Sequence, residues 1–235
     1  MKTTKDNHQA LHSVQPAVNG LAAKGAAVKV LNLYAGIGGN RKLWTNVEVT
    51  AVEIKKEVAD VYQDIFPNDK VIVGDAHKYL LEHYSEFDFI WASPPCPTHS
   101  RINHSRTRKP DYPDMKLYAE IIFLKQWFDG KFVVENVIPY YTPLIAGHII
   151  DRHIFWSNFQ LGYFEPSQKA EIRMQGNRHP IEYFEKIFGF DLSKYKLSDR
   201  RQKLRNCVHP ETGEYIMNCA KNIITKQNAK QHELF

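Results

Sequence analysis

Between residues 28 and 137, short apolar runs alternate with stretches of helical spacing, and this alternation limits the fold more than any other feature of the sequence. The apolar runs predict buried strands: VKVLNLYAG, VEVTAVEI, KVIVGD, FDFIWAS and KFVVENV, beginning at residues 28, 47, 70, 87 and 131. The stretches between them predict helices: NRKLWTN, KEVADVYQDIF, HKYLLEHY and MKLYAEIIFLKQWF. Strands that alternate with helices build a parallel sheet with helices on both faces. The predicted fold class is therefore α/β with a mostly parallel sheet.

Residues suited to binding or chemistry follow each of the five predicted strands. They are the glycine-rich turn 36–39, Glu53, Asp75, Cys96 and Glu135. In open α/β sheets, ligands bind at the carboxyl ends of the strands, near the point where the strand order reverses. The sequence therefore predicts one ligand edge that collects side chains from five strands. After residue 137 the pattern is weaker, with a strand expected within 151–162 and a helix from about residue 210.

Composition excludes some classes of protein without selecting one. At 235 residues and 43% hydrophobic, the chain is large enough for a buried core, and its net charge of +5 is compatible with a polyanionic partner. The three cysteines form no CxxC pair and the histidines lack zinc-ligand spacing, so neither a disulfide framework nor a metal site is predicted. The N-terminal residues lack the apolar core of a secretory signal, and no segment is long enough to span a membrane. The expected location is the cytoplasm.

The turn YAGIGG, residues 34–39, lies between a strand and the next predicted helix. Its glycines would let backbone N–H groups approach a ligand closely, or would only make a tight turn, and the sequence leaves both open. Glu53 follows Gly36 by 17 residues, near the ~20-residue spacing at which an acid binds ribose hydroxyls. Asp75 would accept a hydrogen bond from an adenine amino group, or cap the helix that follows it.

The stretch Ser93-Pro94-Pro95-Cys96 places a thiol at the end of a strand on a stiff backbone. Cys96 is either a packed thiol or a nucleophile, and this context favours the nucleophile, with nearby Arg and Lys expected to lower its pKa. Glu135 ends another inner strand, where a buried carboxylate needs a ligand or a cation. Near Cys96, a carboxyl with a raised pKa would be able to protonate a ring nitrogen.

The loop THSRINHSRTRKPDYPDM, residues 98–115, is basic and interrupted by prolines. A loop of this kind is usually a solvated surface segment. Next to an active site, its side chains would suit phosphate contacts that position a polyanion without reading its sequence. The candidates for such contacts are Ser100, Arg101, Arg106, Arg108 and Lys109.

Taken together, these motifs resemble those of the cytosine-5 DNA methyltransferases that use S-adenosylmethionine. YAGIGG is similar to the family's F-x-G-x-G-G with Tyr34 in place of phenylalanine, PPC and ENV match outright, and RNCV resembles G-N-x-V with Arg205 in place of glycine. The resemblance covers about 28–160 and 198–220. It implies a Rossmann-like methyltransferase fold that binds S-adenosylmethionine and releases S-adenosylhomocysteine. The implied cofactor-binding residues are Tyr34, Ala35, Gly36, Ile37, Gly38, Gly39, Glu53, Ile54, Asp75, Ala76, Pro94, Asn206 and Val208.

The resemblance also implies a domain organisation and a partner. The expected parts are a flexible leader (1–27), a catalytic and cofactor-binding domain (28–160), a small target-recognition region (161–204) and a C-terminal segment that returns to the catalytic domain (205–235). The implied partner is double-stranded DNA, with no membrane. Because the recognition region is short for the family, the enzyme is expected to read little sequence, or to work as a homo-oligomer or with an accessory subunit.

The implied mechanism is covalent. Cys96 adds to carbon 6 of a flipped cytosine, Glu135 holds or protonates ring nitrogen 3, and carbon 5 then takes the methyl group. The family's Q-x-R-x-R strand is represented only by DRHIFW, so either Arg152 or His153 takes its role, and Arg152 is the candidate for steadying the base or its phosphate.

The sequence leaves three alternative functions open. These are methylation of an exocyclic amino group (N4 of cytosine or N6 of adenine), carbon-5 methylation of cytosine in RNA, and binding of nucleic acid without catalysis. A restriction-modification enzyme, a viral genome-protection enzyme and a solitary methylase would look alike at this level.

Overall fold

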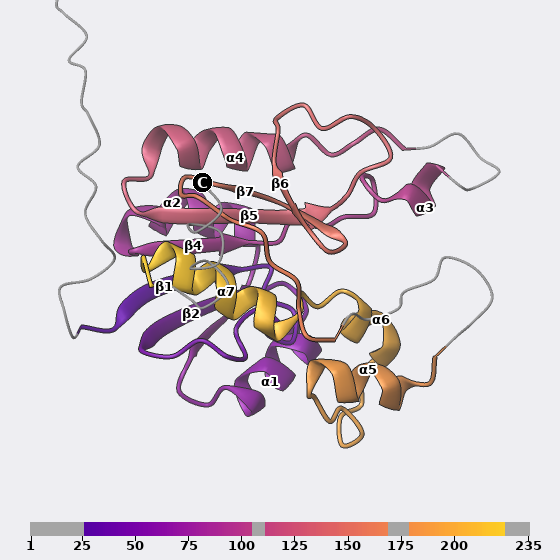
Figure 1. Cartoon of the computed structure of the whole chain (residues 1–235). Coiled ribbons are helices and arrows are strands. Elements are labelled where there is room, and N and C mark those ends of the chain that lie inside the picture. The colour runs from indigo at the N-terminus through magenta and orange to yellow at the C-terminus, as the bar shows by residue number, and fades with distance from the viewer. Residues whose placement is uncertain (1–25, 105–110, 169–178, 224–235) are drawn as a thin grey trace, which may run out of the picture.

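The computed structural model describes residues 26–104, 111–168 and 179–223. Within them, seven strands form one sheet of order β3-β2-β1-β4-β5-β7-β6 with helices on both faces (Figure 1). The strands are β1 (Val28–Leu33), β2 (Val47–Glu53), β3 (Lys70–Val73), β4 (Phe89–Ala92), β5 (Lys131–Val137), β6 (His148–Ile150) and β7 (His153–Ser157). The helices are α1 (Lys56–Ile65), α2 (Ala76–His83), the 3₁₀ turn η1 (Tyr84–Glu86), α3 (Arg101–His104), α4 (Lys116–Trp127), α5 (Ile181–Phe188), α6 (Arg200–Arg205) and α7 (Pro210–Ala220).

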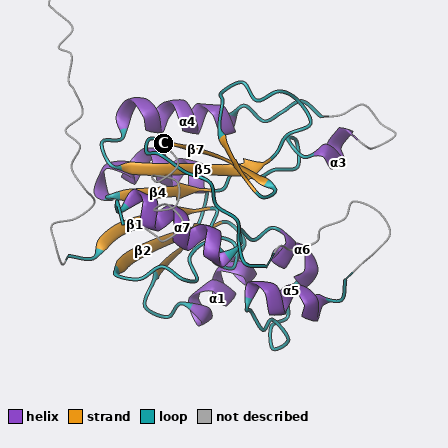
Figure 2. Ribbon diagram, in the orientation of Figure 1, coloured by secondary structure: helices purple, strands orange, loops and turns teal. Residues whose placement is uncertain are grey.

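The sheet is parallel from β3 across to β5, and β7 runs antiparallel between β5 and β6 (Figure 2). The chain builds outward from β1 to β3 and then crosses back to β4 on the other side of β1. The strand order therefore reverses between β1 and β4, which is the switch point where Rossmann-like sheets bind ligands. The predicted fold class, a Rossmann-like α/β fold with a mostly parallel sheet, is confirmed. Strand β6 was not predicted.

Side chains of the central strands alternate between two apolar cores, as expected for a sheet covered on both faces. One core takes Leu31, Leu33, Ile90, Ala92, Phe132 and Val134, and packs against α2 and α4. The other takes Val30, Phe89, Trp91 and Val133, and packs against α7. This two-sided burial explains why the central strands are continuous apolar runs, and it leaves their carboxyl ends as the place for polar residues.

The segment NRKLWTN, residues 40–46, does not form a helix, so that prediction is wrong. It makes successive turns in which Arg41 N donates to Gly38 O and Trp44 N donates to Arg41 O. Side chains explain the difference, because Asn40 bonds to buried Asn32 and the Arg41 guanidinium pairs with Asp69 at 2.8 Å. These long-range contacts override a weak local preference for helix.

Helices α5 and α6 pack on α1 and share a third core with the turn after β1. This core includes Ile37, Val58, Val61, Phe184, Phe188, Leu192 and Leu204. Helix α5 ends at Gly189, whose φ of 66° lies in the left-handed region that favours glycine at a helix C-terminus. The lobe of α5 and α6 therefore sits against the same turn that carries the glycine motif. The proposed boundaries of the four parts of the chain stay predictions.

Two absences apply to the described residues. None of the helices resolved in 26–104, 111–168 and 179–223 combines the length and the apolar character needed to cross a membrane. In the same parts of the chain, His, Cys, Asp and Glu side chains do not gather into a group that would hold a metal ion.

Candidate active site

The carboxyl ends of the parallel strands meet at one edge of the sheet, and the predicted site residues lie there. Strand β1 leads into the glycine turn, and β2 ends at Glu53. The segment after β4 carries Cys96, and β5 carries Glu135 near its end. Because β1, β2, β4 and β5 are parallel neighbours, these residues, widely separated in the sequence, share one edge.

The turn after β1 has a backbone that favours glycine at two positions. Gly36 and Gly38 have φ of 56° and 84°, in the left-handed region. A Cβ at Gly38 would meet Phe66 at 2.3 Å, whereas a Cβ at Gly36 would meet nothing within 4 Å. Gly36 therefore borders open space, and its N–H donates to Glu53 Oε2 at 3.0 Å. Ala35 and Ile37 are buried, which leaves backbone atoms as their means of contacting a ligand.

The late motif RNCV packs directly against this turn. A Cβ at Gly39 would meet Cys207 Cβ at 2.6 Å and the carbonyl oxygen of Val208 at 2.7 Å. Cys207 and Val208 are buried, while Asn206 caps the end of α6 and is exposed. Two motifs from opposite ends of the sequence thus pack against each other, and the contact of Asn206 and Val208 with a ligand stays a prediction.

The two acids beside the glycine turn are held by backbone N–H groups. Glu53 accepts from Gly36 N and, through Oε1, from Lys55 N at 3.0 Å. Asp75 is exposed and its Oδ1 accepts from Lys78 N at 3.0 Å, a bond that holds the pKa of this carboxyl below its usual range. Asp75 therefore caps α2, which confirms the helix-cap alternative and leaves its contact with a ligand a prediction.

Two apolar side chains border the acids. Ile54 follows Glu53 directly and is 66% exposed, which is unusual for an isoleucine beside a buried strand and suits packing against a flat ring. Ala76 begins α2 and is buried. Pro94, on the far side of β1, is also buried.

Cys96 lies half-buried after β4, and burial raises the pKa of its thiol. The negative charge of Glu135 raises this pKa further, while the Arg152 guanidinium offsets part of the rise. The expectation that nearby cations lower the thiol pKa is therefore wrong, because desolvation outweighs the cation. At neutral pH the resting form of Cys96 is the thiol.

Glu135 is buried, with 6% of its surface exposed. Burial raises the pKa of its carboxyl to about 7, against the opposing effects of a hydrogen bond from Ser93 and the charge of Arg152. A carboxyl that titrates near neutral pH is able to take up and release a proton during a reaction.

The side chain of Asn136 links the ENV motif to the PPC motif by a hydrogen bond. Its Nδ2 donates to the carbonyl oxygen of Pro94 at 3.0 Å, and its Oδ1 accepts from Val137 N at 3.0 Å. The ENV motif on β5 therefore fixes the backbone that carries the PPC motif. Sequence reasoning assigned no role to this amide, although a buried Asn next to Glu135 was a signal that a polar contact had to exist.

Arg152, in the turn between β6 and β7, and His153, the first residue of β7, have different contacts. The imidazole Nε2 of His153 lies 3.6 Å from Glu135 Oε1, and burial holds the pKa of this histidine well below its usual range, so it is neutral. Arg152 is half-buried, and its Nη2 donates to the carbonyl oxygen of Cys207 at 2.8 Å. His153 thus faces the carboxylate, while Arg152 links the hairpin to the RNCV motif. The role of each in the reaction stays a prediction.

The loop after Cys96 is anchored at its beginning. His99 is buried, its Nδ1 lies 2.6 Å from Tyr141 Oη, and Tyr140 N donates to its carbonyl oxygen at 3.2 Å. Ser100 forms a β-bridge with Pro139, and Arg101 begins α3 with its side chain exposed. The other predicted phosphate contacts, Arg106, Arg108 and Lys109, lie outside the described residues.

One cluster at this edge was missed by sequence reasoning. Glu120 of α4 is fully buried, and its Oε1 accepts from Tyr34 Oη at 2.5 Å and lies 2.8 Å from His77 Nδ1. The available signal was a carboxylate one turn from Leu117 and Leu124, on the face of the helix that enters the core.

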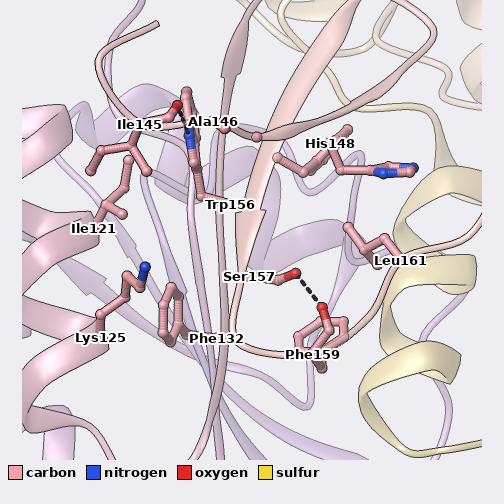
Figure 3. A pocket seen from close by; sticks show the side chains of 12 residues that line it. Ile121, Lys125, Phe132, Ile145, Ala146, His148, Trp156, Ser157, Phe159 and Leu161 are labelled. Atoms are coloured by element: carbon pink, nitrogen blue, oxygen red, sulfur yellow. Dashed lines mark hydrogen bonds between the residues drawn. The ribbon is translucent and has the colours of Figure 1, made fainter.

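A separate cavity of about 310 Å³ lies at the opposite end of β5 (Figure 3). Its walls include Phe132 at the start of β5 and Ser157 at the end of β7, where Ser157 Oγ donates to the carbonyl oxygen of Phe159. Lys125 reaches toward it from α4. Neither Glu135 nor Cys96 lines this cavity, although Phe155, which lies opposite Glu135 on β7, does.

Comparison with known sequences supplies a family match and one curated relative. The family model described as C-5 cytosine-specific DNA methylase matches residues 28–140. Type II methyltransferase M1.HgaI from Avibacterium volantium is 27% identical over 120 residues, which cover 46% of this chain and 34% of that protein. The match thus spans about a third of the relative's length.

Two solved structures illustrate the structural similarities. The putative methyltransferase yhhF from Escherichia coli has a TM-score of 0.40 and 14% identity, over 56% of this chain and 75% of that chain. A mutant of DNMT2 from Spodoptera frugiperda has a TM-score of 0.35 and 25% identity, over 47% of this chain and 36% of that chain.

Proposed function

This chain belongs to the C-5 cytosine-specific DNA methylase family through residues 28–140, and from that membership we propose that it methylates carbon 5 of cytosine in double-stranded DNA. The methyl donor is S-adenosylmethionine and the other product is S-adenosylhomocysteine. The observation that carries the proposal is the pairing of Cys96 and Glu135 at the ends of adjacent parallel strands, β4 and β5, locked by the bond from Asn136 to Pro94.

The residues at the edge of the sheet fit the cofactor. Gly36 borders open space that would admit a ligand close to the backbone, and Glu53 offers a carboxylate at the position suited to ribose hydroxyls. Ile54 presents an exposed apolar surface for the adenine ring, and Asp75 presents a carboxylate for its amino group. Asn206 and Val208 complete the site. When bound, the cofactor supplies an electrophilic methyl group on a sulfonium ion.

The chemistry proposed for the protein is a covalent addition and elimination. The target cytosine is flipped out of the duplex because carbon 6 is shielded in the stack. The sulfur of Cys96 bonds to carbon 6 while Glu135 protonates nitrogen 3, and the electron pair displaced from the ring double bond makes carbon 5 nucleophilic. After carbon 5 has taken the methyl group, its proton passes to solvent water, and the electron pair of the C–H bond re-forms the double bond between carbons 5 and 6. The carbon–sulfur bond breaks to release the Cys96 thiolate, and nitrogen 3 returns its proton to Glu135.

The protonation states of Cys96 and Glu135 support this sequence of steps. Above about pH 7 the pair holds one proton, on the Cys96 thiol, because the pKa of Glu135 is about 7 and the thiol pKa is raised. The reactive form holds the same proton on the carboxyl, so the thiol must pass its proton to the Glu135 side as the base is attacked. Neutral His153, 3.6 Å from Glu135, and Arg152 are proposed to steady the base and this carboxyl.

DNA contacts and sequence selectivity are proposed for two segments. The loop that begins at Ser100 and Arg101, with Arg106, Arg108 and Lys109, would contact phosphates. Residues 161–204 would read the target, and their described part exposes Lys186 and Lys196. Because this region is short, we propose that the enzyme reads a short site or works with a second copy or an accessory subunit. The reducing cytoplasm is the proposed location, with restriction-modification as one setting, since the relative is named a Type II methyltransferase.

The test is transfer of tritium from labelled S-adenosylmethionine to mixed-sequence double-stranded DNA, followed by mass spectrometry of the digested product. We expect 5-methylcytosine as the labelled nucleoside. Label on N4 of cytosine or N6 of adenine would favour amino methylation, and label on RNA but not on DNA would change the substrate. No transfer, together with retained DNA binding, would favour the non-catalytic alternative.

A further inference from the structure

Three polar side chains from three elements meet beside the proposed cofactor site. Tyr34 belongs to the turn after β1, His77 to the first turn of α2, and Glu120 to the middle of α4. Tyr34 Oη donates to Glu120 Oε1 at 2.5 Å, and His77 Nδ1 lies 2.8 Å from the same oxygen. One oxygen of a fully buried carboxylate therefore joins the glycine turn to α2.

The burial of Glu120 shows that this contact is built into the fold. Its side chain is 0% exposed, and its other oxygen, Oε2, is buried without a hydrogen-bond partner among the residues that the structure describes. Burial removes this carboxylate from water and raises its pKa. Such burial costs folding free energy unless hydrogen bonds to the carboxylate offset it. Tyr34 and His77 provide the contacts that offset this cost.

Tyr34 has an unusual backbone conformation. Its φ is 56°, in the left-handed region, where a bulky residue is rarely found. Residues in such conformations persist when the surrounding structure holds them. The hydroxyl of Tyr34 reaches Glu120, and this hydroxyl is absent from the phenylalanine that the resembling motif carries. The bond to Glu120 is therefore a feature of this chain.

The position of the cluster relates it to the cofactor. Tyr34 opens the turn in which Gly36 bonds to Glu53, and His77 follows Asp75 by two residues on α2. These are the two sides between which adenosine is proposed to bind. Burial and the charge of Glu120, with smaller effects of Asp75 and Asp114, raise the pKa of the Tyr34 phenol, which keeps it protonated and able to donate.

We propose that Glu120 is a positioning residue of the cofactor site. By holding Tyr34 and His77 through one oxygen, it clamps the turn 34–39 to α2 and keeps the turn in its binding conformation before the cofactor arrives. The role of the clamp rests on the proposed function, since it presupposes a cofactor between these elements. Losing the hydroxyl should loosen the empty turn and weaken binding, because the cofactor must then order it.

The test is calorimetric binding of S-adenosylhomocysteine to the full chain and to two matched variants. Tyr34→Phe should weaken binding about ten-fold, the effect of a lost hydrogen bond to a charged group. Tyr215→Phe removes a phenol of α7 that accepts from Gly162 N at 2.8 Å, and it should leave the affinity as it was. Equal affinities for the wild type and Tyr34→Phe would overturn the clamp alone. No binding by the folded wild type would overturn the proposed function.

Two further readouts separate a clamp from a general loss of stability. Amide hydrogen exchange in the cofactor-free protein should quicken at Gly38, whose N–H donates to Ala35 O at 3.0 Å, in Tyr34→Phe and not in Tyr215→Phe. In steady-state assays, the KM for S-adenosylmethionine should rise while the KM for DNA does not. Unchanged exchange at Gly38, or equal rises in both KM values, would contradict the clamp.

A double-mutant cycle tests the partner assignment. Glu120→Gln should also weaken S-adenosylhomocysteine binding, and the double variant Tyr34→Phe with Glu120→Gln should bind no more weakly than the worse single variant, because both changes act on the same bond. Additive losses would show that the two residues act separately. If Glu120→Gln does not fold, the exchange and affinity data for Tyr34→Phe still decide the matter.

Discussion

In the two halves of the predicted ligand edge, the pKa values of the carboxyl groups are shifted in opposite directions. On the side of β4 and β5, Glu135 is buried, and its pKa is raised to about 7. On the side of β2 and β3, Asp75 is exposed, and a backbone N–H group holds its pKa below the usual range. The same chemical group thus titrates near neutral pH in one place and stays negatively charged in the other.

From this difference we expect the half with Cys96 and Glu135 to carry out the chemistry, and the half with Glu53 and Asp75 to bind the cofactor. Desolvation around Cys96 and Glu135 makes their protonation states easy to change, which suits proton transfer at neutral pH. The open side keeps the Asp75 carboxylate charged and leaves Ile54 exposed, which suits a ligand that must enter and leave. The comparison predicts that changes in the first half alter the rate of chemistry, and changes in the second alter cofactor affinity.

The largest effect is expected from Cys96→Ser. Serine is a poor nucleophile without a base that removes its proton, so methyl transfer should fall on the order of 10⁴-fold. Binding of S-adenosylhomocysteine should not change, since Cys96 is on the chemical side. The tritium-transfer assay and calorimetry measure the two quantities. Methyl transfer at the wild-type rate in this variant would contradict the assignment of the chemistry to the half that contains Cys96.

Glu135→Gln should lower the turnover number by roughly 10²- to 10⁴-fold, the usual contribution of a general acid. The raised pKa of Glu135 means that its carboxyl is protonated below about pH 7 and loses the proton as pH rises through that value. The pair is reactive when it holds one proton, so wild-type activity should rise through about pH 7 and fall again as the Cys96 thiol ionises.

The amide variant cannot titrate, so the rise near pH 7 should vanish from its profile of kcat against pH. Only the dependence on Cys96 would remain. If the variant keeps the rise near pH 7, another group is responsible for it and the role of Glu135 is different.

Asp75→Asn should affect only the binding half. Asparagine caps helices as well as aspartate does, so thermal stability should be retained, while loss of the charge should weaken S-adenosylmethionine binding about ten-fold. Asp199→Asn is the matched control, because Asp199 caps α6 through a similar bond to Gln202 N at 3.0 Å. Equal affinities of the two variants would mean that Asp75 is a cap and nothing more.

The smallest effect is expected far from both halves. Ser157→Ala in the cavity of Figure 3 removes one hydrogen bond to Phe159 and should cost about 1 kcal/mol of unfolding free energy. Both the methylation rate and the cofactor affinity should stay at wild-type values. A change in either would show that the opposite end of β5 communicates with the site.

The sequence predicted the parts of the fold that local patterns control. Apolar runs marked β1 to β5, and the residues at their ends marked the ligand edge, because a parallel sheet leaves only those positions for polar groups. The turn 40–46 was mistaken for helix because its shape depends on the contacts of Asn40 and Arg41 with distant residues. Strand β6, of three residues, is too short to show a period.

The site was predictable in its residues and less so in its energetics. The motifs predicted that Cys96 and Glu135 lie at the same edge of the sheet, as the structure has them, but the thiol pKa was expected to fall, and burial raises it. Burial depends on tertiary packing, which the charges along the sequence do not reveal. The bond from Asn136 to Pro94 and the contact of Glu120 with Tyr34 join distant segments. Local spacing indicated that these polar side chains face the core, but not which partners they meet there.

The most direct test of the central claim is to trap the proposed adduct. In DNA that carries 5-fluorocytosine, fluorine replaces the carbon-5 hydrogen that must leave, so the final elimination cannot occur and the enzyme should stay bonded to carbon 6. Mass spectrometry of the digested complex should find the modified nucleotide on the peptide that contains Cys96. An adduct on Cys207 or Cys219, or methylation of ordinary DNA without any trapped adduct, would contradict the account.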